Sequence, residues 1–396
     1  MKEKKFFVSG DDAVAIGARL ARPQVISAYP ITPQTIVVER LSEMVEDGSL
    51  KAEFMHVESE HSAMSAAMGV SSVGARAFTA TSSQGLLYMA EGLHYASGGR
   101  YPIVMMNANR SVALPWSIFG DLRDSLSQLD SGWIQVYVED AQEALDMIIQ
   151  AYKIAENKDV LTPFMVNLDG FVLTHTYEEV LVPLQDEVDK FLPAFDTPNK
   201  MDEENPKNMG FSTTPADNME FKYQQHKAMM DSLQVIQDVD KEYGDLFGRY
   251  YNGLIDTYKC KDADVVLITV GSVTGTARIV VDKMRKEGKK VGLLKLRYMR
   301  PFPEKEVNEV LKDKAVIGVL DKDISFGFEG TIYTNVNSSL SRLIKKPASY
   351  NFVAGMGGRD ISKQDIEEMY NNLFDAKNGE EIDRVKFVNM GVKIDG

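Results

Sequence analysis

The sequence predicts an α/β protein with two domains, each built on a mostly parallel sheet. Its 396 residues exceed the size of one ordinary domain. Short apolar runs alternate with longer stretches of helical periodicity up to about residue 170, and the alternation resumes near residue 262. Between these parts, residues 183–218 lose the periodicity and are rich in proline and charged residues, as expected of a long surface connection.

The first part has the pattern of a doubly wound sheet, because strands and helices alternate along it. The expected strands are residues 25–28, 53–56, 77–81, 103–107, 133–137 and 163–167. The expected helices are residues 11–21, 35–47, 60–73, 84–96 and 141–156. Ligands of such sheets bind at the carboxyl ends of the strands, so functional residues are expected there.

The second part begins after a helical stretch at residues 226–242. Its expected elements are strands at residues 264–269, 290–296, 315–320 and 349–353, a tight turn at 271–275 and a helix at 276–288. The predicted division is therefore a first domain at residues 1–182, a crossover linker and helix at 183–255, and a second domain at 256–396.

Composition limits the possible partners. The net charge is −14, which argues against a nucleic-acid partner. The single cysteine, Cys260, allows neither an internal disulfide nor a cluster held by four thiolates. No segment approaches the roughly 20 apolar residues that span a bilayer, and the N-terminus lacks the apolar run of a signal peptide. We therefore expect a cytoplasmic protein without a membrane partner.

The first candidate motif is Ser-Ala-Tyr-Pro-Ile-Thr-Pro-Gln-Thr at residues 27–35. Its prolines stiffen the segment between a strand and a helix, where Thr32 could present its hydroxyl to a ligand. A structural alternative is equally compatible with the spacing: a rigid loop with Thr35 as the helix N-cap.

The second motif places Glu60 at the start of a helix built from small residues. A carboxyl in such a setting is a candidate for acid–base chemistry. The commoner explanation is an acidic residue that suits the helix dipole. His56 and His61 flank the segment without forming a His-x-x-x-His pair, and no cysteine supports them, so no metal site is expected.

The third candidate is Arg110, directly after an apolar strand. An arginine there suits bidentate capture of a small carboxylate or phosphate, and a structural salt bridge is an equal alternative. The loop that follows, at residues 116–124, has the composition of a pocket wall. The glycine turn at 271–275 is not Gly-x-Gly-x-x-Gly, so we expect it to bind nothing.

Together these stretches resemble the pyruvate:ferredoxin oxidoreductase family. The matching segments occur in family order over nearly the whole chain: Tyr-Pro-Ile-Thr-Pro at 29–33, Ser59-Glu60, Ser-Gln-Gly-Leu-Leu at 83–87, Arg110, Ser-Ile-Phe-Gly-Asp at 117–121, Asp-Gly-Phe at 169–171, Gly271-Ser272 and Arg-Pro-Phe-Pro at 300–303. The resemblance implies a pyrimidine-type thiamine diphosphate domain followed by a transketolase C-terminal-like α/β domain. It also implies oxidative decarboxylation of a 2-oxoacid, with acyl transfer to coenzyme A and electrons sent to ferredoxin.

The resemblance also implies roles for individual residues. Glu60 would bond the aminopyrimidine ring of thiamine, and Thr32 and Arg110 would hold the substrate carboxylate. The other residues expected to line the cofactor are Tyr29, Pro30, Ser83 and Gln84.

Leu122 is expected in the substrate wall, where many relatives carry histidine. An apolar wall makes 2-oxoisovalerate or phenylglyoxylate the alternatives to pyruvate, which is the first expectation. Oxalate is the least expected, because a dianion calls for more positive charge near Thr32.

The chain would depend on partners. It has no Gly-Asp-Gly signature for the metal that holds the diphosphate, and one cysteine cannot build an electron relay. The resemblance therefore implies a β subunit carrying the diphosphate, Mg²⁺ and a [4Fe-4S] cluster, and γ and ferredoxin-like δ subunits with further clusters. Two alternative hypotheses are a non-catalytic scaffold and a nucleotide-binding protein built around residues 271–275. The presence of Glu60, Thr32 and Arg110 disfavours the scaffold.

Overall fold

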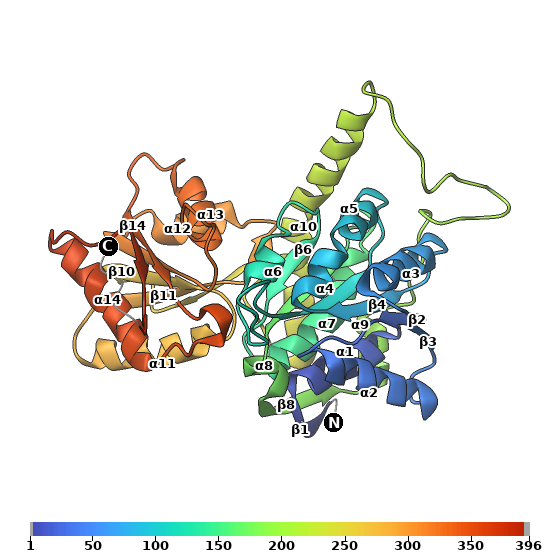
Figure 1. Ribbon diagram of the computed structural model, residues 1–396, viewed down its shortest axis with the longest axis horizontal. Helices are drawn as coiled ribbons and strands as arrows, with labels where there is room; N and C mark the ends of the chain where they lie inside the picture. The colour runs from blue at the N-terminus through green and yellow to red at the C-terminus, as the bar shows by residue number, and fades with distance from the viewer. Residues whose placement is uncertain (1–2, 392–396) are drawn as a thin grey trace.

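The computed structural model describes residues 3–391 and contains two α/β domains side by side (Figure 1). The first domain is built on a seven-stranded sheet with the order β12-β6-β7-β5-β4-β2-β3. Its strands are β2 (Val25–Ala28), β3 (Glu53–His56), β4 (Ala77–Thr81), β5 (Val104–Asn109), β6 (Ile134–Tyr137), β7 (Phe164–Asp169) and β12 (Tyr298–Arg300). All neighbours pair in parallel except β12, which runs antiparallel to β6.

Helices cover both faces of this sheet. One face packs against α1 (Gly10–Ala21), α2 (Thr35–Glu46), α7 (Ala141–Ala155) and the C-terminal half of α10 (Asn218–Phe247). The opposite face packs against α3 (Glu60–Ser72), α4 (Ser83–Tyr88) and α5 (Ala90–Gly98). The remaining elements of this part are α6 (Arg123–Leu126), α8 (Val172–His175), α9 (Gln185–Phe191) and an antiparallel ribbon of β1 (Glu3–Ser9) with β8 (Tyr177–Pro183).

The second domain is a six-stranded sheet with the order β15-β14-β13-β10-β11-β9. Its strands are β9 (Ile255–Tyr258), β10 (Val265–Thr269), β11 (Val291–Leu296), β13 (Val316–Asp321), β14 (Ala348–Val353) and β15 (Val385–Phe387). Helices α12 (Glu304–Leu311) and α13 (Thr331–Leu340) pack on one face, and α11 (Val273–Lys286) and α14 (Lys363–Lys377) pack on the other. A single 3₁₀ turn, Met356–Gly358, precedes α14.

The strands expected from the sequence are present to within two residues at each end, and so are most of the helices. Three elements differ from those expected from the sequence. The helix expected at 84–96 is divided into α4 and α5 at Met89. The helix expected at 226–242 extends over 30 residues, and its added N-terminal turns were not predicted because their apolar side chains, such as Met219 and Phe221, are exposed and not packed on the sheet. β12, inside the range expected for the second domain, lies at the edge of the first sheet.

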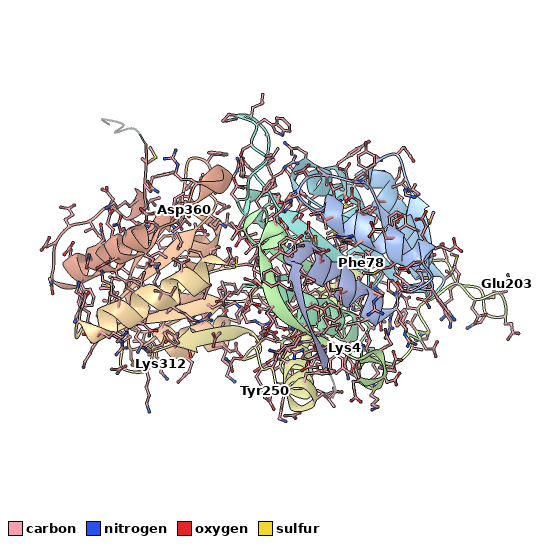
Figure 2. All side chains as sticks on the ribbon, turned by 90° about the horizontal axis from the view of Figure 1, so that it is seen from below. Lys4, Phe78, Glu203, Tyr250, Lys312 and Asp360 are labelled. Atoms are coloured by element: carbon pink, nitrogen blue, oxygen red, sulfur yellow. The ribbon has the colours of Figure 1, made fainter. Side chains whose placement is uncertain are left out.

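The N-terminal half of α10 and the connection before it project from the first domain (Figure 1). Glu203 lies far out on this connection, whereas Phe78 lies inside the first domain and is fully buried (Figure 2). The connection therefore matches the long surface segment expected from its composition, with α9 as its one short helix. Among residues 3–391, no helix has the length and apolar character needed to cross a membrane.

Buried ion pairs join the two domains. Glu143 on α7 accepts hydrogen bonds from Lys295 Nζ at 2.6 Å and from Arg297 Nε at 2.8 Å. Burial acts to raise the pKa of Glu143, but the two cations outweigh it and hold that pKa at about 2. A buried pair that loses one partner leaves an uncompensated charge, so these contacts fix the position of one domain on the other.

Candidate active site

The predicted site residues gather at the carboxyl edge of the first sheet, where β2, β4 and β5 end next to one another. Residues 29–34 follow β2, Ser83 follows β4, and Arg110 follows β5. Adjacent parallel strands bring these three loops to one edge of the sheet. Glu60, the first residue of α3, lies beside them against α4.

Arg110 connects two of these loops. Its side chain is 5% exposed, and it donates from Nη1 to the Thr32 carbonyl at 2.7 Å and from Nη2 to Gln84 Oε1 at 2.8 Å. The third donor, Nε, is buried and has no partner among the described residues. Burial lowers the pKa of this guanidinium, and the Asp124 and Glu60 carboxyl groups oppose the shift. The group stays charged, and its Nε–H has no partner among the described residues and can serve a ligand.

The loop that contains Thr32 is largely exposed, but hydrogen bonds from the buried Gln34 hold it to the sheet. Tyr29, Pro30 and Thr32 are all exposed, whereas Gln34 is fully buried. Gln34 Nε2 donates to the Tyr29 carbonyl at 2.9 Å and to the Ala80 carbonyl at 3.3 Å. Arg110 binds the backbone carbonyl of Thr32, so the hydroxyl of Thr32 is not used in that contact. Gln34 lies inside the motif at residues 27–35, but the sequence did not indicate its buried anchoring role.

Glu60 lies in a space that a glycine leaves open. Ser59 caps α3 by accepting from the Ser62 amide at 3.2 Å, and the Glu60 side chain is 8% exposed. A Cβ on Gly85 would lie 2.6 Å from Glu60 Oε1 and 2.6 Å from Thr81 Oγ1. Among the described residues, none donates a hydrogen bond to the Glu60 carboxyl group, and Thr81 Oγ1 is buried without a partner. The space thus presents two polar groups that a bound molecule can satisfy.

The side chains of Ser83 and Gln84 contact each other. The Ser83 hydroxyl donates to the Ser111 carbonyl at 2.6 Å and also contacts Gln84 Oε1, so it is held inside the protein. Gln84 is half-buried and serves Arg110. The structure therefore connects Ser83, Gln84, Arg110 and Thr32 in one hydrogen-bonded chain.

Asp124 lies behind this chain and was not singled out in the sequence. It is fully buried and accepts five hydrogen bonds: from the amides of Ser83 (3.1 Å), Arg110 (3.1 Å) and Ser125 (2.7 Å) and from the side-chain amides of Asn107 (3.2 Å) and Asn109 (2.9 Å). Burial raises the pKa of Asp124 to about 6, against the effect of these donors. The carboxylate is therefore ionised at neutral pH.

Leu122 is not brought to the same place. Its side chain is 1% exposed and belongs to an apolar cluster with second-domain residues such as Ile268 and Val319. Its amide donates to the Lys322 carbonyl at 3.0 Å. This burial between the domains does not favour a direct substrate contact by Leu122.

The turn at Gly271–Ser272 makes a domain contact. Asp169 Oδ2, at the end of β7, accepts from the Ser272 amide at 2.8 Å and from its hydroxyl at 2.6 Å, and Asp169 Oδ1 pairs with Lys322. Gly271 has φ +72°, and a Cβ there would lie 2.7 Å from Asp169 Oδ2. The glycine thus permits the close approach of the first domain.

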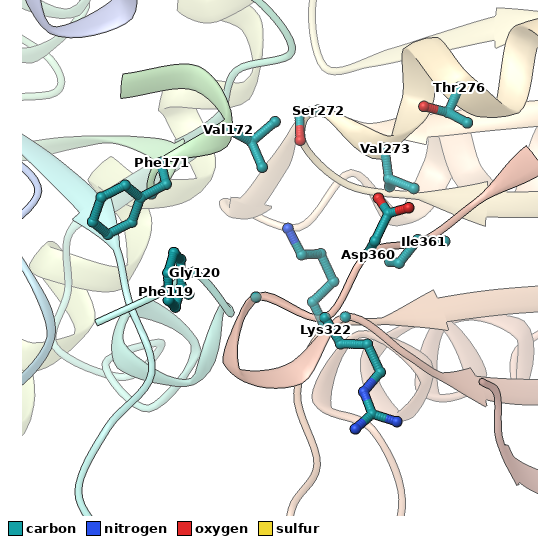
Figure 3. A pocket seen from close by; sticks show the side chains of 14 residues that line it. Phe119, Gly120, Phe171, Val172, Ser272, Val273, Thr276, Lys322, Asp360 and Ile361 are labelled. Atoms are coloured by element: carbon teal, nitrogen blue, oxygen red, sulfur yellow. The ribbon is translucent and has the colours of Figure 1, made fainter. Parts of the chain in front are cut away.

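A cavity of about 190 Å³ lies beside this contact, between the domains (Figure 3). Phe119 and Phe171 line it from the first domain, and Lys322 and Asp360 from the second. Across residues 3–391, histidine, cysteine and acidic side chains form no group of three or more that could hold a metal ion.

A doubly wound domain with a buried glutamate and arginine at its carboxyl edge is followed by a second α/β domain, and both domains match models of one enzyme family. Residues 16–241 match the family model described as pyruvate flavodoxin/ferredoxin oxidoreductase, thiamine diphosphate-binding. Residues 263–366 match the model of the pyruvate:ferredoxin oxidoreductase core domain II. The chain belongs to the pyruvate:ferredoxin oxidoreductase family, and the resemblance seen in its motifs is confirmed.

Curated relatives agree with this assignment over most of their length. The chain is 48% identical to pyruvate synthase subunit PorA of Methanothermobacter thermautotrophicus, over 91% of this chain and 93% of the relative. It is 49% identical to PorA of Methanocaldococcus jannaschii, over 93% and 95%. It is also 45% identical to ketoisovalerate oxidoreductase subunit VorA of Pyrococcus horikoshii, over 93% of each chain.

Two solved structures share the fold. One is the 2-oxoglutarate:ferredoxin oxidoreductase of Magnetococcus marinus with 2-oxoglutarate, coenzyme A and succinyl-CoA bound, at a TM-score of 0.71 and 20% identity. The match covers 93% of this chain and 65% of that chain. The other is a split-gene transketolase, an inactive β4 tetramer, at a TM-score of 0.53 and 11% identity, covering 93% and 99%. The predicted fold class is confirmed.

Proposed function

We propose that this chain is the α subunit of a multi-subunit 2-oxoacid:ferredoxin oxidoreductase whose substrate is pyruvate. The reaction is reversible: pyruvate and coenzyme A give acetyl-CoA, CO₂ and one proton, and two electrons pass singly to ferredoxin. The observation that carries the proposal is the placement of a buried Arg110 and a buried Glu60 at one sheet edge, close enough for the Glu60 carboxyl group to raise the pKa of Arg110 against the effect of burial. Relatives named pyruvate synthase, up to 49% identical over nearly their whole length, support the choice of pyruvate.

Arg110 is proposed to bind the substrate carboxylate. Its guanidinium is already oriented by Thr32 and Gln84, so binding requires little loss of side-chain freedom. Nε is the donor that remains available, and a charge-assisted hydrogen bond in a buried setting is stronger than one in water. The exposed Thr32 side chain supplies a neutral hydroxyl nearby.

Glu60 is proposed to bond the aminopyrimidine ring of thiamine diphosphate. The Glu60 carboxyl group lies in the space that the missing side chain of Gly85 leaves, next to the unpartnered Thr81 hydroxyl, and these two polar groups suit hydrogen bonds to a polar ring. When bound, the cofactor supplies the electron sink for the pair released as CO₂ leaves. Glu60 holds or moves a proton at a ring nitrogen. Tyr29, Pro30 and Gln84 line the approach, and the buried Ser83 contacts Gln84 from inside the protein.

The rest of the cofactor is proposed to belong to partner chains. One cysteine cannot supply the four thiolates of a [4Fe-4S] cluster. We assign the diphosphate, its Mg²⁺ and one cluster to a β subunit, and further clusters to γ and ferredoxin-like δ subunits. Coenzyme A is the proposed co-substrate.

A second candidate substrate is 2-oxoisovalerate, because VorA relatives reach 45% identity over most of this chain. Leu122 was the sequence reason to consider bulkier acids, including phenylglyoxylate. Its buried position between the domains weakens that reason. Pyruvate therefore remains the proposed substrate, and oxalate the least favoured.

The test is anaerobic viologen reduction by the natively purified complex, supplied with thiamine diphosphate, Mg²⁺ and coenzyme A. Pyruvate, 2-oxoisovalerate, phenylglyoxylate, 2-oxoglutarate and oxalate are offered in parallel, and kcat/KM is compared. Preference for pyruvate is the expected result. Preference for 2-oxoisovalerate would replace the substrate and keep the reaction. No reduction by a complex with intact clusters and thiamine would favour a scaffold role.

A further inference from the structure

Asp124 is a charged group enclosed at the centre of the candidate active site. It is fully buried, and all five of its hydrogen-bond partners are N–H donors of the protein. Enclosing a carboxylate is costly unless such donors replace water. Because it has donors around it and no acceptor, the ionised form is the one this enclosure accommodates.

Four of the five donors lie on or just after the two strands whose ends carry the site, and the fifth is the Ser125 amide on α6. Oδ2 of Asp124 accepts from the Ser83 amide and from the Arg110 amide, each at 3.1 Å. Ser83 begins α4, which also contains Gln84 and Gly85. One oxygen atom thereby connects the backbone after β4 to the backbone after β5.

The same connection extends to both proposed chemical groups. After β5, Asp124 accepts from the amide of Arg110, whose guanidinium is proposed to bind substrate. After β4, Asp124 accepts from the Ser83 amide at the start of α4. In the same helix, Gln84 orients the Arg110 guanidinium and Gly85 borders the Glu60 carboxyl group. A shift at either amide would therefore change the separation of Arg110 from Glu60.

We infer that Asp124 is a positioning residue of the reaction, which acts through Arg110 by fixing its guanidinium relative to Glu60. The inference rests on the proposed substrate role of Arg110. Asp124 contacts neither loop 29–32 nor Glu60 directly by any hydrogen bond among the described residues. Its effect on substrate must therefore pass through the backbone and the guanidinium.

The test is a double-mutant cycle in the reconstituted complex. Asp124→Asn keeps the size of the side chain but turns an NH₂ group toward N–H donors, which weakens their positioning. It is expected to raise KM for pyruvate about tenfold in the native background. In the Arg110→Ala background the same change is expected to alter KM less than about twofold, because coupled residues are not additive.

Two further measurements make the outcome decisive. Hydrogen exchange of the Ser83 and Arg110 amides should accelerate in Asp124→Asn, while exchange in β10 and β11 stays unchanged. Asp121→Asn is the matched control, because Asp121 is buried in the same loop but accepts from the Arg123 and Gly357 amides. Because Asp121 lies in the loop expected to form a pocket wall, the KM of Asp121→Asn is compared with that of Asp240→Asn, whose carboxyl group is buried outside the site and accepts from the Tyr251 and Gly253 amides. Asp240→Asn should leave KM unchanged. Asp124→Ser, with room for water to accept from the same donors, replaces Asp124→Asn if the amide prevents assembly.

The possible failures are distinguishable. Equal KM effects of Asp124→Asn in both backgrounds, or unchanged exchange of the two amides, would overturn the positioning role. An unchanged KM in Arg110→Ala alone would instead contradict the proposed substrate role of Arg110, and amide exchange would still decide whether Asp124 positions this loop.

Discussion

A Cβ on Gly85 would lie 2.6 Å from Oε1 of Glu60, closer than non-bonded atoms come. The space beside this carboxyl group therefore exists because residue 85 has no side chain. Gly85 lies inside α4, where glycine is less favourable than alanine by about 1 kcal/mol. Glycine at this position thus lowers helix stability and leaves room at Glu60, as expected at a functional site.

Gly85→Ala should displace the Glu60 carboxyl group from the position in which it is proposed to bond the pyrimidine ring. A displacement of about 1 Å can reduce turnover by about 100-fold, and that is the expected loss in kcat. Gly69→Ala in α3 is the control, since a Cβ there meets nothing within 4 Å. The proposal fails for this position if both alanine variants retain the native rate.

Glu60→Gln should remove the proton-holding group and keep the shape of the site. We expect kcat to fall by roughly 10² to 10⁴, with assembly of the complex intact. Glu58→Gln is the matched control, because Glu58 is exposed two residues earlier and bonds only Ser62 among the described residues. A near-native rate in Glu60→Gln, measured by pyruvate-dependent viologen reduction, would remove Glu60 from the mechanism.

Arg110→Ala should chiefly weaken substrate capture. Loss of a charge-assisted hydrogen bond corresponds to about 1.5–3 kcal/mol, so kcat/KM for pyruvate should fall by about 10- to 100-fold. Arg22→Ala removes an exposed arginine paired with Asp189 and should leave kcat/KM unchanged. Identical saturation curves for the native and Arg110→Ala complexes would contradict the proposed role.

The sequence was sufficient to predict the strands of the first sheet and the candidate site residues near its carboxyl edge, because strand periodicity and strand ends are local signals. It placed Arg110 after β5 and Glu60 at the start of α3. It did not reveal Asp124 or Gln34, whose partners lie up to 46 residues away and are set by tertiary packing. The same limit applies to β12, which has only three residues and pairs with a strand of the other domain.

The Gly271–Ser272 turn was noticed in the sequence, but its contact with the first domain was not predicted. The turn was expected to bind nothing, and its glycine pattern gave no reason to expect a contact with the first domain. Only the fold brings Asp169 to the Ser272 amide and hydroxyl. Gly271 and Ser272, which match the family, therefore have a structural role as a contact between the two domains. This role depends on how the domains pack, which the sequence does not give.

Glu143 provides a test of the domain contact through pH. The pKa of Glu143 is held at about 2, below the value near 4.3 of an unfolded chain, so the unfolded state binds the proton more readily. Its contribution to stability, about 3 kcal/mol, is present above about pH 5 and is lost as the pH falls toward 2. Glu143→Gln leaves Lys295 and Arg297 buried without their carboxylate, which should lower the free energy of unfolding by about 3–5 kcal/mol at pH 7.

Urea unfolding of the full chain at pH 7, 5, 4 and 3 measures this difference. The gap between the native chain and Glu143→Gln should narrow as the pH falls, because protonation removes the same charge that the substitution removes. Asp231→Asn breaks a surface pair with Lys227 on α10 and should cost less than about 1 kcal/mol at every pH. A gap that stays constant from pH 7 to pH 4 and below would show that the Glu143 charge does not hold the domains together.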